Sequence, residues 1–365
     1  MTPSTESDVN NHLKSIELDE LGQKLGDVAS IADVELSDGR LKARIEFGLP
    51  IERAFDDIES EIGEKLRSLA GVEDVELVLG TTIVAHGVQR NLKPLDNVRN
   101  VIAVASGKGG VGKSTVAVNL ALALAADGAR VGLLDADIYG PSQPHMVGLA
   151  GEQPVSEDGK TMAPLDALGL QVMSIGFLVD ADQPMVWRGP MVTSALNQLL
   201  HQTNWQDLDY LIVDMPPGTG DIQLTLSQQV PVSGAVIVTT PQDIAAIDAR
   251  KGLAMFRKVA IPVLGVIENM STHVCSSCGH EEAIFGEGGA ERMAEDFDVT
   301  VLGQLPLDAN IRAQTDAGNP TVVSDPDSAA ASAYRAASRR MAARLATKSK
   351  DYAAKFPNIV VEGAQ

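Results

Sequence analysis

The chain has 365 residues, a net charge of −20 and an isoelectric point near 4.6. Such an acidic surface repels the phosphate backbone of nucleic acids, so we expect no nucleic-acid partner. No apolar run approaches the ~20 residues that cross a bilayer, and residues 1–10 lack the apolar core of a signal peptide. We therefore expect a cytoplasmic protein with no stable membrane insertion.

The N-terminal part of the chain predicts a small α+β domain at residues 12–80, preceded by a disordered segment at 1–11. Its first two strands alternate apolar and polar residues on either side of Ser37-Asp38-Gly39, which is a hairpin signature. A helix, two strands, a helix and a strand are expected over residues 13–25, 28–36, 40–49, 51–69 and 72–79. Residues 81–99 show little periodicity and predict a linker.

The pattern changes at Val101, where short runs rich in β-branched residues begin to alternate with segments of helical spacing. Such apolar runs are buried on both faces, as in a parallel sheet with helices on either side. We predict an α/β domain at 100–346 with a doubly wound, mainly parallel sheet, followed by a tail at 347–365. Ligands of such sheets bind beyond the carboxyl ends of the strands. The predicted strands begin near residues 101, 130, 170, 210, 234, 262 and 299.

A glycine-rich loop, GKGGVGKST, follows the first of these strands and opens a helix. Its four glycines let backbone N–H groups turn toward phosphate oxygens, and the helix N-terminus adds a partial positive charge. Lys113 is expected to reach the β- and γ-phosphates of ATP, and the Ser114 hydroxyl to ligate Mg²⁺. The candidate ATP-binding residues are Gly107, Lys108, Gly109, Gly110, Val111, Gly112, Lys113, Ser114 and Thr115.

Carboxylates end two of the other predicted strands. Asp214 closes an apolar strand before two prolines and a glycine, the arrangement in which a carboxylate holds Mg²⁺, usually through water. Asp135 and Asp137 end the strand after the phosphate loop, and we expect Asp135 to support the loop structure. Asn269 ends a later strand, where its amide is a candidate for reading the adenine edge, although a turn is the more common role of an asparagine at such a place.

The chain has two cysteines, Cys275 and Cys278, spaced C-x-x-C, so no disulfide framework is possible. Three kinds of site compete for this pair. A redox pair usually stands at a helix start, which the surrounding sequence does not suggest. A zinc site would recruit His273 or His280, but a second C-x-x-C is absent. An iron–sulfur site needs four thiolates, which two chains together supply.

Residues 95–320 resemble the Mrp-type ATPases, also called ApbC or Nbp-like iron–sulfur cluster carriers, within the ParA/MinD superfamily. The resemblance rests on GKGGVGKST, DADIYGPS, WRGPM, DMPPGTGD, TTPQ, ENMS, the C-x-x-C and IFGEGGAERMAE. We have no chemical account of WRGPM, at Trp187 to Met191.

The resemblance implies a function and roles for single residues. ATP is hydrolysed, with Lys108 reaching the partner's nucleotide across a homodimer and Asp137 positioning the attacking water, so the catalytic candidates are Lys108, Lys113, Asp137 and Asp214. Cys275 and Cys278 of two chains bridge one [4Fe–4S] cluster. A cluster-assembly scaffold as donor and apo iron–sulfur proteins as clients are the implied partners.

Residues 12–80 resemble the small iron–sulfur-assembly domain that is often fused before such ATPases. Many members of that domain carry a cysteine near the end of the second strand. This chain has Gly48-Leu49-Pro50-Ile51 at that place. We therefore expect a docking role without thiol chemistry.

A MinD-like cell-division ATPase or a ParA-like partitioning ATPase, with a structural zinc at the C-x-x-C, is the alternative function. A membrane-bound relative of MinD would end in a basic amphipathic helix. Residues 328–350 are helical in pattern and carry four arginines, but their apolar stripe is thin. We predict that this helix packs on the domain and turns a solvated arginine face outward, with Arg335, Arg339, Arg340 and Arg344.

The acidic composition predicts a dependence of stability on salt. It suits a cell with high internal salt, because screening reduces repulsion between crowded carboxylates, although an ordinary cytoplasm fits the composition equally well. We expect the melting temperature, followed by calorimetry, to rise with KCl well beyond physiological ionic strength. A flat or falling curve would contradict the saline interpretation.

Overall fold

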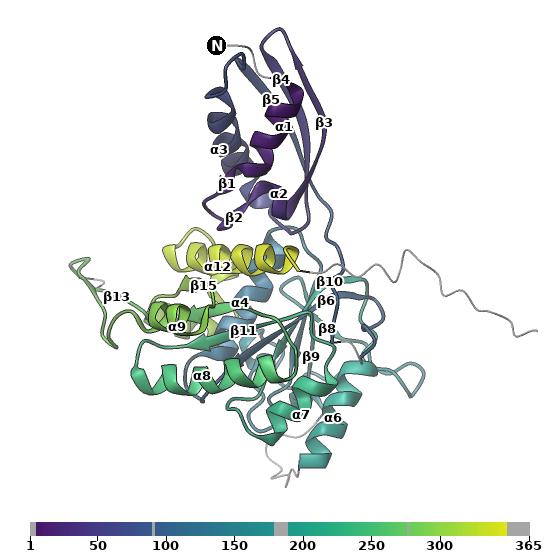
Figure 1. Ribbon diagram of the computed structural model, residues 1–365. Helices are drawn as coiled ribbons and strands as arrows, with labels where there is room; N and C mark the ends of the chain where they lie inside the picture. The colour runs from purple at the N-terminus through teal and green to yellow at the C-terminus, as the bar shows by residue number, and fades with distance from the viewer. Residues whose placement is uncertain (1–4, 90–91, 179–188, 276, 349–365) are drawn as a thin grey trace, which may run out of the picture.

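The computed structural model describes residues 5–89, 92–178, 189–275 and 277–348. A small N-terminal domain stands on one side of a larger α/β domain (Figure 1). Three predicted features fall outside the described residues: residues 1–4 of the N-terminal tail, Trp187-Arg188 of the WRGPM motif, and the C-terminal tail from residue 349.

The N-terminal domain is a three-stranded sheet with helices on it. Strand β3 pairs antiparallel with β4, and β4 pairs parallel with β5. Its hairpin turns at Asp38 and Gly39, both with positive φ, as tight hairpins require. Alternate residues of β4 point into the core, as the sequence pattern predicted. The elements are α1 (Glu6–Ser15), β1 (Glu17–Leu18), β2 (Gln23–Lys24), α2 (Leu25–Val28), β3 (Ala29–Ser37), β4 (Arg40–Phe47), η1 (Glu52–Ala54), α3 (Phe55–Arg67) and β5 (Asp74–Thr81).

The first helix corrects one predicted boundary. Helix α1 begins at Glu6, inside the segment that the sequence analysis assigned to disorder. A capping box explains the early start: the Thr5 hydroxyl accepts from the Asp8 backbone N–H at 3.2 Å, and the Asp8 carboxylate accepts from the Thr5 N–H at 2.9 Å. Val9 and Leu13 of this helix are fully buried.

The α/β domain contains an eight-stranded sheet in the order β15-β12-β11-β6-β10-β7-β9-β8. All seven predicted runs are strands of this sheet and pair in parallel, which confirms the predicted fold class. The sequence analysis missed β8 (Leu165–Ala167), a short antiparallel edge strand. The parallel strands are β6 (Val98–Ser106), β7 (Val131–Asp135), β9 (Leu170–Ser174), β10 (Leu208–Asp214), β11 (Gly234–Thr239), β12 (Val263–Glu268) and β15 (Val301–Gln304).

Helices cover both faces of this sheet (Figure 1). Helix α4 is apolar all round its middle and is buried from Val116 to Leu124, because it lies between the sheet and α12. The other helices of the domain are α5 (Gln143–Met146), η2 (Ile175–Phe177), α6 (Gly189–His201), α7 (Asp221–Gln229), α8 (Asp243–Lys258), α9 (Gly289–Phe297), α10 (Ala309–Asp316) and α11 (Thr321–Ser324); α4 spans Lys113–Ala126 and α12 spans Ala329–Ala346.

Helix α12 packs on the domain as predicted, but its arginine face is not solvated. The apolar side chains Tyr334, Met341 and Leu345 are fully buried. Arg339 is only 6% exposed and donates twice to the Asp127 carboxylate at 2.7 Å, and also to Glu20. The other three arginines are half-buried. Among the described residues, no helix combines the length and apolar character needed to cross a membrane.

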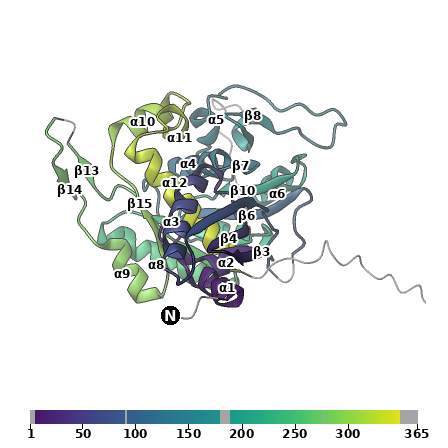
Figure 2. The same ribbon diagram turned by 90° about the horizontal axis from the view of Figure 1, so that it is seen from above.

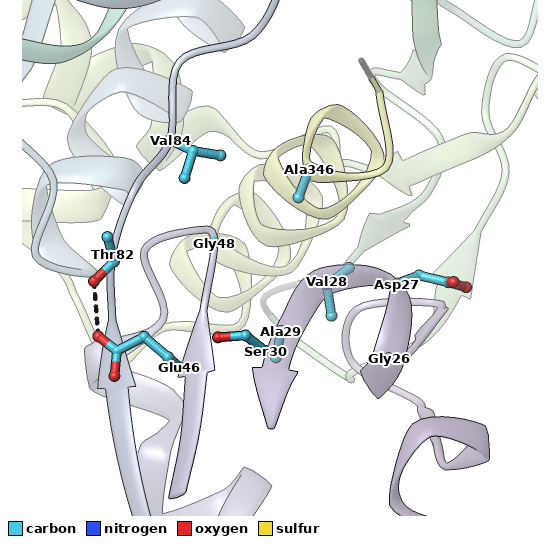
Figure 3. A pocket seen from close by; sticks show the side chains of 10 residues that line it. All are labelled: Gly26, Asp27, Val28, Ala29, Ser30, Glu46, Gly48, Thr82, Val84 and Ala346. Atoms are coloured by element: carbon cyan, nitrogen blue, oxygen red, sulfur yellow. Dashed lines mark hydrogen bonds between the residues drawn. The ribbon is translucent and has the colours of Figure 1, made fainter. Parts of the chain in front are cut away.

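The Arg339 pairs join the two domains, because Glu20 belongs to the N-terminal domain and Asp127 ends helix α4. Nearby, the Glu52 N–H donates to the Asp127 carbonyl at 3.2 Å. A cavity of about 240 Å³ remains beside this junction, between the start of β3, the end of β4 and Ala346 of α12 (Figure 3). The N-terminal domain is thus fastened to the end of α4 that lies farthest from the phosphate loop.

Replacement of Arg339 by alanine should destabilise the protein strongly. The substitution leaves the Asp127 carboxylate buried without a cation, which typically costs about 3–5 kcal/mol. Urea unfolding of the full chain measures the loss. Arg312→Ala is the matched control, because Arg312 pairs with Asp316 in solvent, and such pairs contribute about 0–1 kcal/mol. Equal losses in the two variants would contradict this role of Arg339.

Candidate functional site

The glycine-rich loop joins β6 to α4 at the carboxyl edge of the sheet. Gly112 has a φ of 80° and caps α4, and a Cβ atom there would lie 2.3 Å from the Asn269 amide nitrogen. A Cβ at Gly107 would lie 2.1 Å from the backbone of Asp248 in α8. Both positions therefore require glycine, and the loop is held closely between α8 and the residue that follows β12.

Lys113 and Asp214 form a buried ion pair under the loop. The Lys113 ammonium contacts the Asp214 carboxylate and lies 3.1 Å from the Ser114 hydroxyl. Lys113 is 6% exposed and Asp214 is fully buried at the end of β10, beside β6. The parallel register of β6 and β10 thus brings together two residues that are 101 positions apart in the sequence.

Gln143 completes this buried group, and the sequence analysis did not identify it. Its amide nitrogen donates to Asp214 at 2.8 Å and to the Ser114 carbonyl at 3.0 Å. Its amide oxygen is buried and has no hydrogen-bond partner among the described residues. A glutamine eight residues after Asp135 carries no local signal of such a role, because its partners come from two other segments.

The donors around Asp214 fit a magnesium ion. Mg²⁺ prefers oxygen ligands and keeps several waters. The Ser114 hydroxyl, the Asp214 carboxylate and the unpartnered Gln143 oxygen are all oxygen donors in one small buried region. Ser114 and Asp214 are thus the residues that would hold the ion.

Asp135 organises the loop that follows β7. Its carboxylate accepts backbone N–H bonds from Asp137 at 3.1 Å and from Ser142 and Gln143 at 3.0 Å, and a hydroxyl bond from Ser174 at 3.2 Å. Complete burial, and then the charge of Asp214, raise the pKa of Asp135 to about 7. Burial also raises the pKa of Asp137 above its usual value.

A pocket of about 230 Å³ opens over the phosphate loop. It brings Lys108, Asp137 and Pro217 to the same space as the loop glycines. Asp214 lies beneath this pocket and does not line it. The lining residues are Ser106, Lys108, Gly109, Gly110, Gly112, Lys113, Ser114, Thr115, Asp137, Ser142, Met146 and Pro217.

Asn269 is buried beside the loop. Its amide nitrogen donates to the Val111 carbonyl at 2.9 Å, and its backbone N–H donates to Thr239 at the end of β11. The amide therefore positions the phosphate loop. The adenine contact of Asn269 stays a prediction.

The two cysteines lie on a hairpin that extends away from the α/β domain (Figure 2). Strands β13 (His273–Val274) and β14 (Glu281–Glu282) pair with each other, and the Gly279 N–H donates to the Cys275 carbonyl at 2.8 Å. Cys278 is exposed and Cys275 is half-buried, and both thiols are free. Backbone N–H groups of Ser277 and Cys278 lower the pKa of Cys275, which favours the thiolate that binds metals.

A zinc site within one chain is not supported by the described residues. They contain no group of three His, Cys, Asp or Glu side chains placed to hold a metal ion. The His273 ring is engaged instead with the Leu307 carbonyl at 2.9 Å.

Comparison with known families assigns the α/β domain. Residues 97–342 match the family described as NUBPL iron-transfer P-loop NTPase, which covers more than half of the chain. The chain belongs to this family. Residues 6–77 match a second family, described as iron–sulfur cluster assembly protein.

Similar proteins share most of the NUBPL-family domain. The iron–sulfur cluster carrier protein of Haemophilus influenzae is 61% identical over 255 residues, which cover 70% of this chain and 69% of that protein. The mouse protein named iron–sulfur cluster transfer protein NUBPL is 56% identical over 256 residues, which cover 70% and 80% of the two chains.

Solved structures agree with this assignment. A nucleotide-binding protein of Archaeoglobus fulgidus, solved with ADP, is 39% identical with a TM-score of 0.55, and the match covers 61% of this chain and 88% of that one. MinD of Pyrococcus horikoshii, at 23% identity and a TM-score of 0.50 over 66% and 94% of the two chains, shares the fold. The nucleotide-binding fold of this NUBPL-family chain is thus established.

Lys113→Ala should weaken ATP binding by roughly tenfold to a hundredfold. A hydrogen bond to a charged group contributes about 1.5–3 kcal/mol, and the substitution also leaves Asp214 buried without its cation. Titration with a fluorescent ATP analogue in the presence of magnesium measures the effect. Lys251→Ala, which removes an exposed lysine of α8, is the control. Unchanged affinity in Lys113→Ala would refute the role of this loop in binding phosphates.

Proposed function

We propose that this chain is an ATP-hydrolysing carrier that binds an iron–sulfur cluster as cargo and transfers it to apoproteins. The observation that carries the proposal is the presence, in one domain, of a phosphate loop over the Lys113–Asp214 pair and of two free thiols on an exposed hairpin. The carrier and transfer names of the similar proteins support the same function.

For ATP hydrolysis, each residue of the nucleotide site has a distinct task. The loop N–H groups and Lys113 bind the phosphates, and Ser114 and Asp214 would hold magnesium, which would offset negative charge on the phosphate oxygens. Asp137 lines the pocket and accepts a proton from the attacking water or orients that water. Burial raises the pKa of Asp137, which makes its carboxylate a stronger proton acceptor than an exposed aspartate. Lys108 acts on the nucleotide of a second chain in a homodimer.

For the cargo, the proposal follows from a ligand count. A [4Fe–4S] cluster takes four thiolates, and each chain has two cysteines. A twofold axis between two hairpins would present Cys275 and Cys278 from each side. Transfer is then an exchange of ligands, in which thiolates of the client replace these four and iron keeps its oxidation state. The exposure of the hairpin favours such an exchange.

The N-terminal domain is proposed to dock a cluster-assembly scaffold or client, because it has no cysteine and lies on the junction with α12. The MinD-like alternative has less support, since the apolar stripe of α12 is buried in the domain and is not available for a membrane surface. We propose that the chain acts in the cytoplasm.

Anaerobic reconstitution with iron and sulfide tests the cargo assignment. The full chain should show a broad absorbance near ~400 nm and about four irons per dimer, as ligation by four thiolates requires. Cys275→Ala and Cys278→Ala should each lose this signal and still bind ATP, because the hairpin lies outside the nucleotide pocket. Ser277→Ala, on the same hairpin, is the control that keeps both thiols.

Subunit mass, measured by light scattering, accompanies the iron determination. The cluster-loaded protein should be a dimer. A monomer that carries one zinc ion and no iron after anaerobic purification would refute the cargo assignment and leave the nucleotide site unaffected.

A further inference from the structure

A four-residue segment that starts at the last residue of β12 connects the nucleotide site with the cysteine hairpin. It runs from Glu268 to Ser271 and is buried at Glu268, Asn269 and Ser271. The cysteine hairpin begins directly after it, and the chain returns beside it at α9. The phosphate loop and the segment that carries the cysteines thus both contact the side chains of these four residues.

On the nucleotide side, the contact is made by Asn269. Its amide nitrogen donates to the Val111 carbonyl inside the phosphate loop at 2.9 Å. The same nitrogen lies so close to Gly112 that an added Cβ would be 2.3 Å from it. Any displacement of this stretch of the loop must therefore move Asn269 or break its hydrogen bond.

On the cysteine side, the contact is made by Glu268. One carboxylate oxygen accepts the Ser271 hydroxyl at 2.6 Å, and the other accepts the Ala290 backbone N–H at 2.7 Å. Ser271 lies two residues before β13, and Ala290 lies in α9, eight residues after β14, so a single carboxylate contacts the chain on both sides of the segment that carries the cysteines. Gly289 packs against this carboxylate at a distance that excludes any larger residue.

Two further observations mark these four residues as more than ordinary packing. Glu268 is 1% exposed and, among the described residues, its carboxylate is held by hydrogen bonds from Ser271, Ala290 and Gln304 and by no ion pair, although burial of a carboxylate is costly. Met270, between Asn269 and Ser271, has a φ of 59°, a strained conformation for a residue with a Cβ atom. Such strain persists where the surroundings hold the backbone in place, and it is common in switch regions.

We propose that Asn269 and Glu268 are positioning residues that couple the nucleotide state of the phosphate loop to the geometry of the cysteine hairpin. When the Val111 carbonyl moves, Asn269 moves with it through their hydrogen bond. The adjacent Glu268 then displaces Ser271 and Ala290, on the two sides of the hairpin segment. The meaning of this coupling for cargo rests on the proposed function. Because coupling between sites is reciprocal, occupancy of the thiols alters nucleotide affinity by the same factor.

Alkylation of the two thiols tests the coupling on the metal-free full chain. The rate of reaction of Cys275 and Cys278 with iodoacetamide is followed by mass spectrometry, with Mg-ADP and with a non-hydrolysable ATP analogue, each at saturation. The two rates should differ by roughly fivefold or more in the unchanged protein, the lower end of usual allosteric coupling. The ratio should fall toward one in Glu268→Gln, which does not touch the loop.

Three further variants complete the design. Ser271→Ala removes one of the three hydrogen bonds that the Glu268 carboxylate accepts, with a smaller change to the core, and should lower the ratio in part. Asn269→Ala should abolish it. Glu295→Gln, an exposed carboxylate of α9, is the matched control and should keep the full ratio. The nucleotide affinity of Glu268→Gln should stay close to that of the unchanged protein, because Glu268 makes no contact with the phosphate loop, and its melting temperature should fall because one buried donor loses its acceptor.

The proposal is overturned if alkylation is equally fast with both nucleotides, or if Glu268→Gln and Ser271→Ala keep the full ratio. Neither result depends on iron. Loss of cluster binding with an intact alkylation ratio would refute the cargo assignment alone. Normal cluster binding with an alkylation ratio of one would refute the coupling alone.

Discussion

The pairing of Lys113 with Asp214 is the interaction around which the α/β domain is arranged. A buried lysine is costly unless a carboxylate lies beside it, so β6 and β10 must be neighbours with their carboxyl ends in register. That register places the phosphate loop directly above the carboxylate. Gln143 then fills the remaining space and ties the loop after β7 to the same centre. The nucleotide pocket is consequently built from three segments that depend on one another.

A second set of charges at the opposite end of α4 gives the chain its overall arrangement. Helix α4 starts at the phosphate loop and ends at Asp127, which Arg339 of α12 holds together with Glu20. The N-terminal domain is therefore attached to the same helix that opens the nucleotide site. A partner docked on that domain contacts a body that is continuous with the nucleotide pocket through one rigid helix.

The sequence was sufficient where function depends on local pattern. The phosphate loop and the strands that end in Asp135 and Asp214 follow from short runs of residues with one physical interpretation. The Cys275–Cys278 pair, by contrast, left three kinds of site open. What could not be predicted depends on contacts between distant positions. Gln143 meets Asp214 across 71 residues, and Arg339 meets Asp127 across 212. An arginine in a helical pattern is ordinarily solvated, so only the packing of α12 shows that this one is buried.

The cysteine hairpin has a further consequence for the lifetime of whatever it holds. Strands β13 and β14 have two residues each and pair only with each other among the described strands. Little apolar surface therefore becomes exposed to water when they separate. Regions of this kind open locally at far lower free energy than the core of a domain. Release of a ligand bound there would then proceed by brief fraying of a few hydrogen bonds, while the sheet and the nucleotide pocket stay folded. The dissociation rate would follow this local equilibrium and would be insensitive to the global stability of the protein.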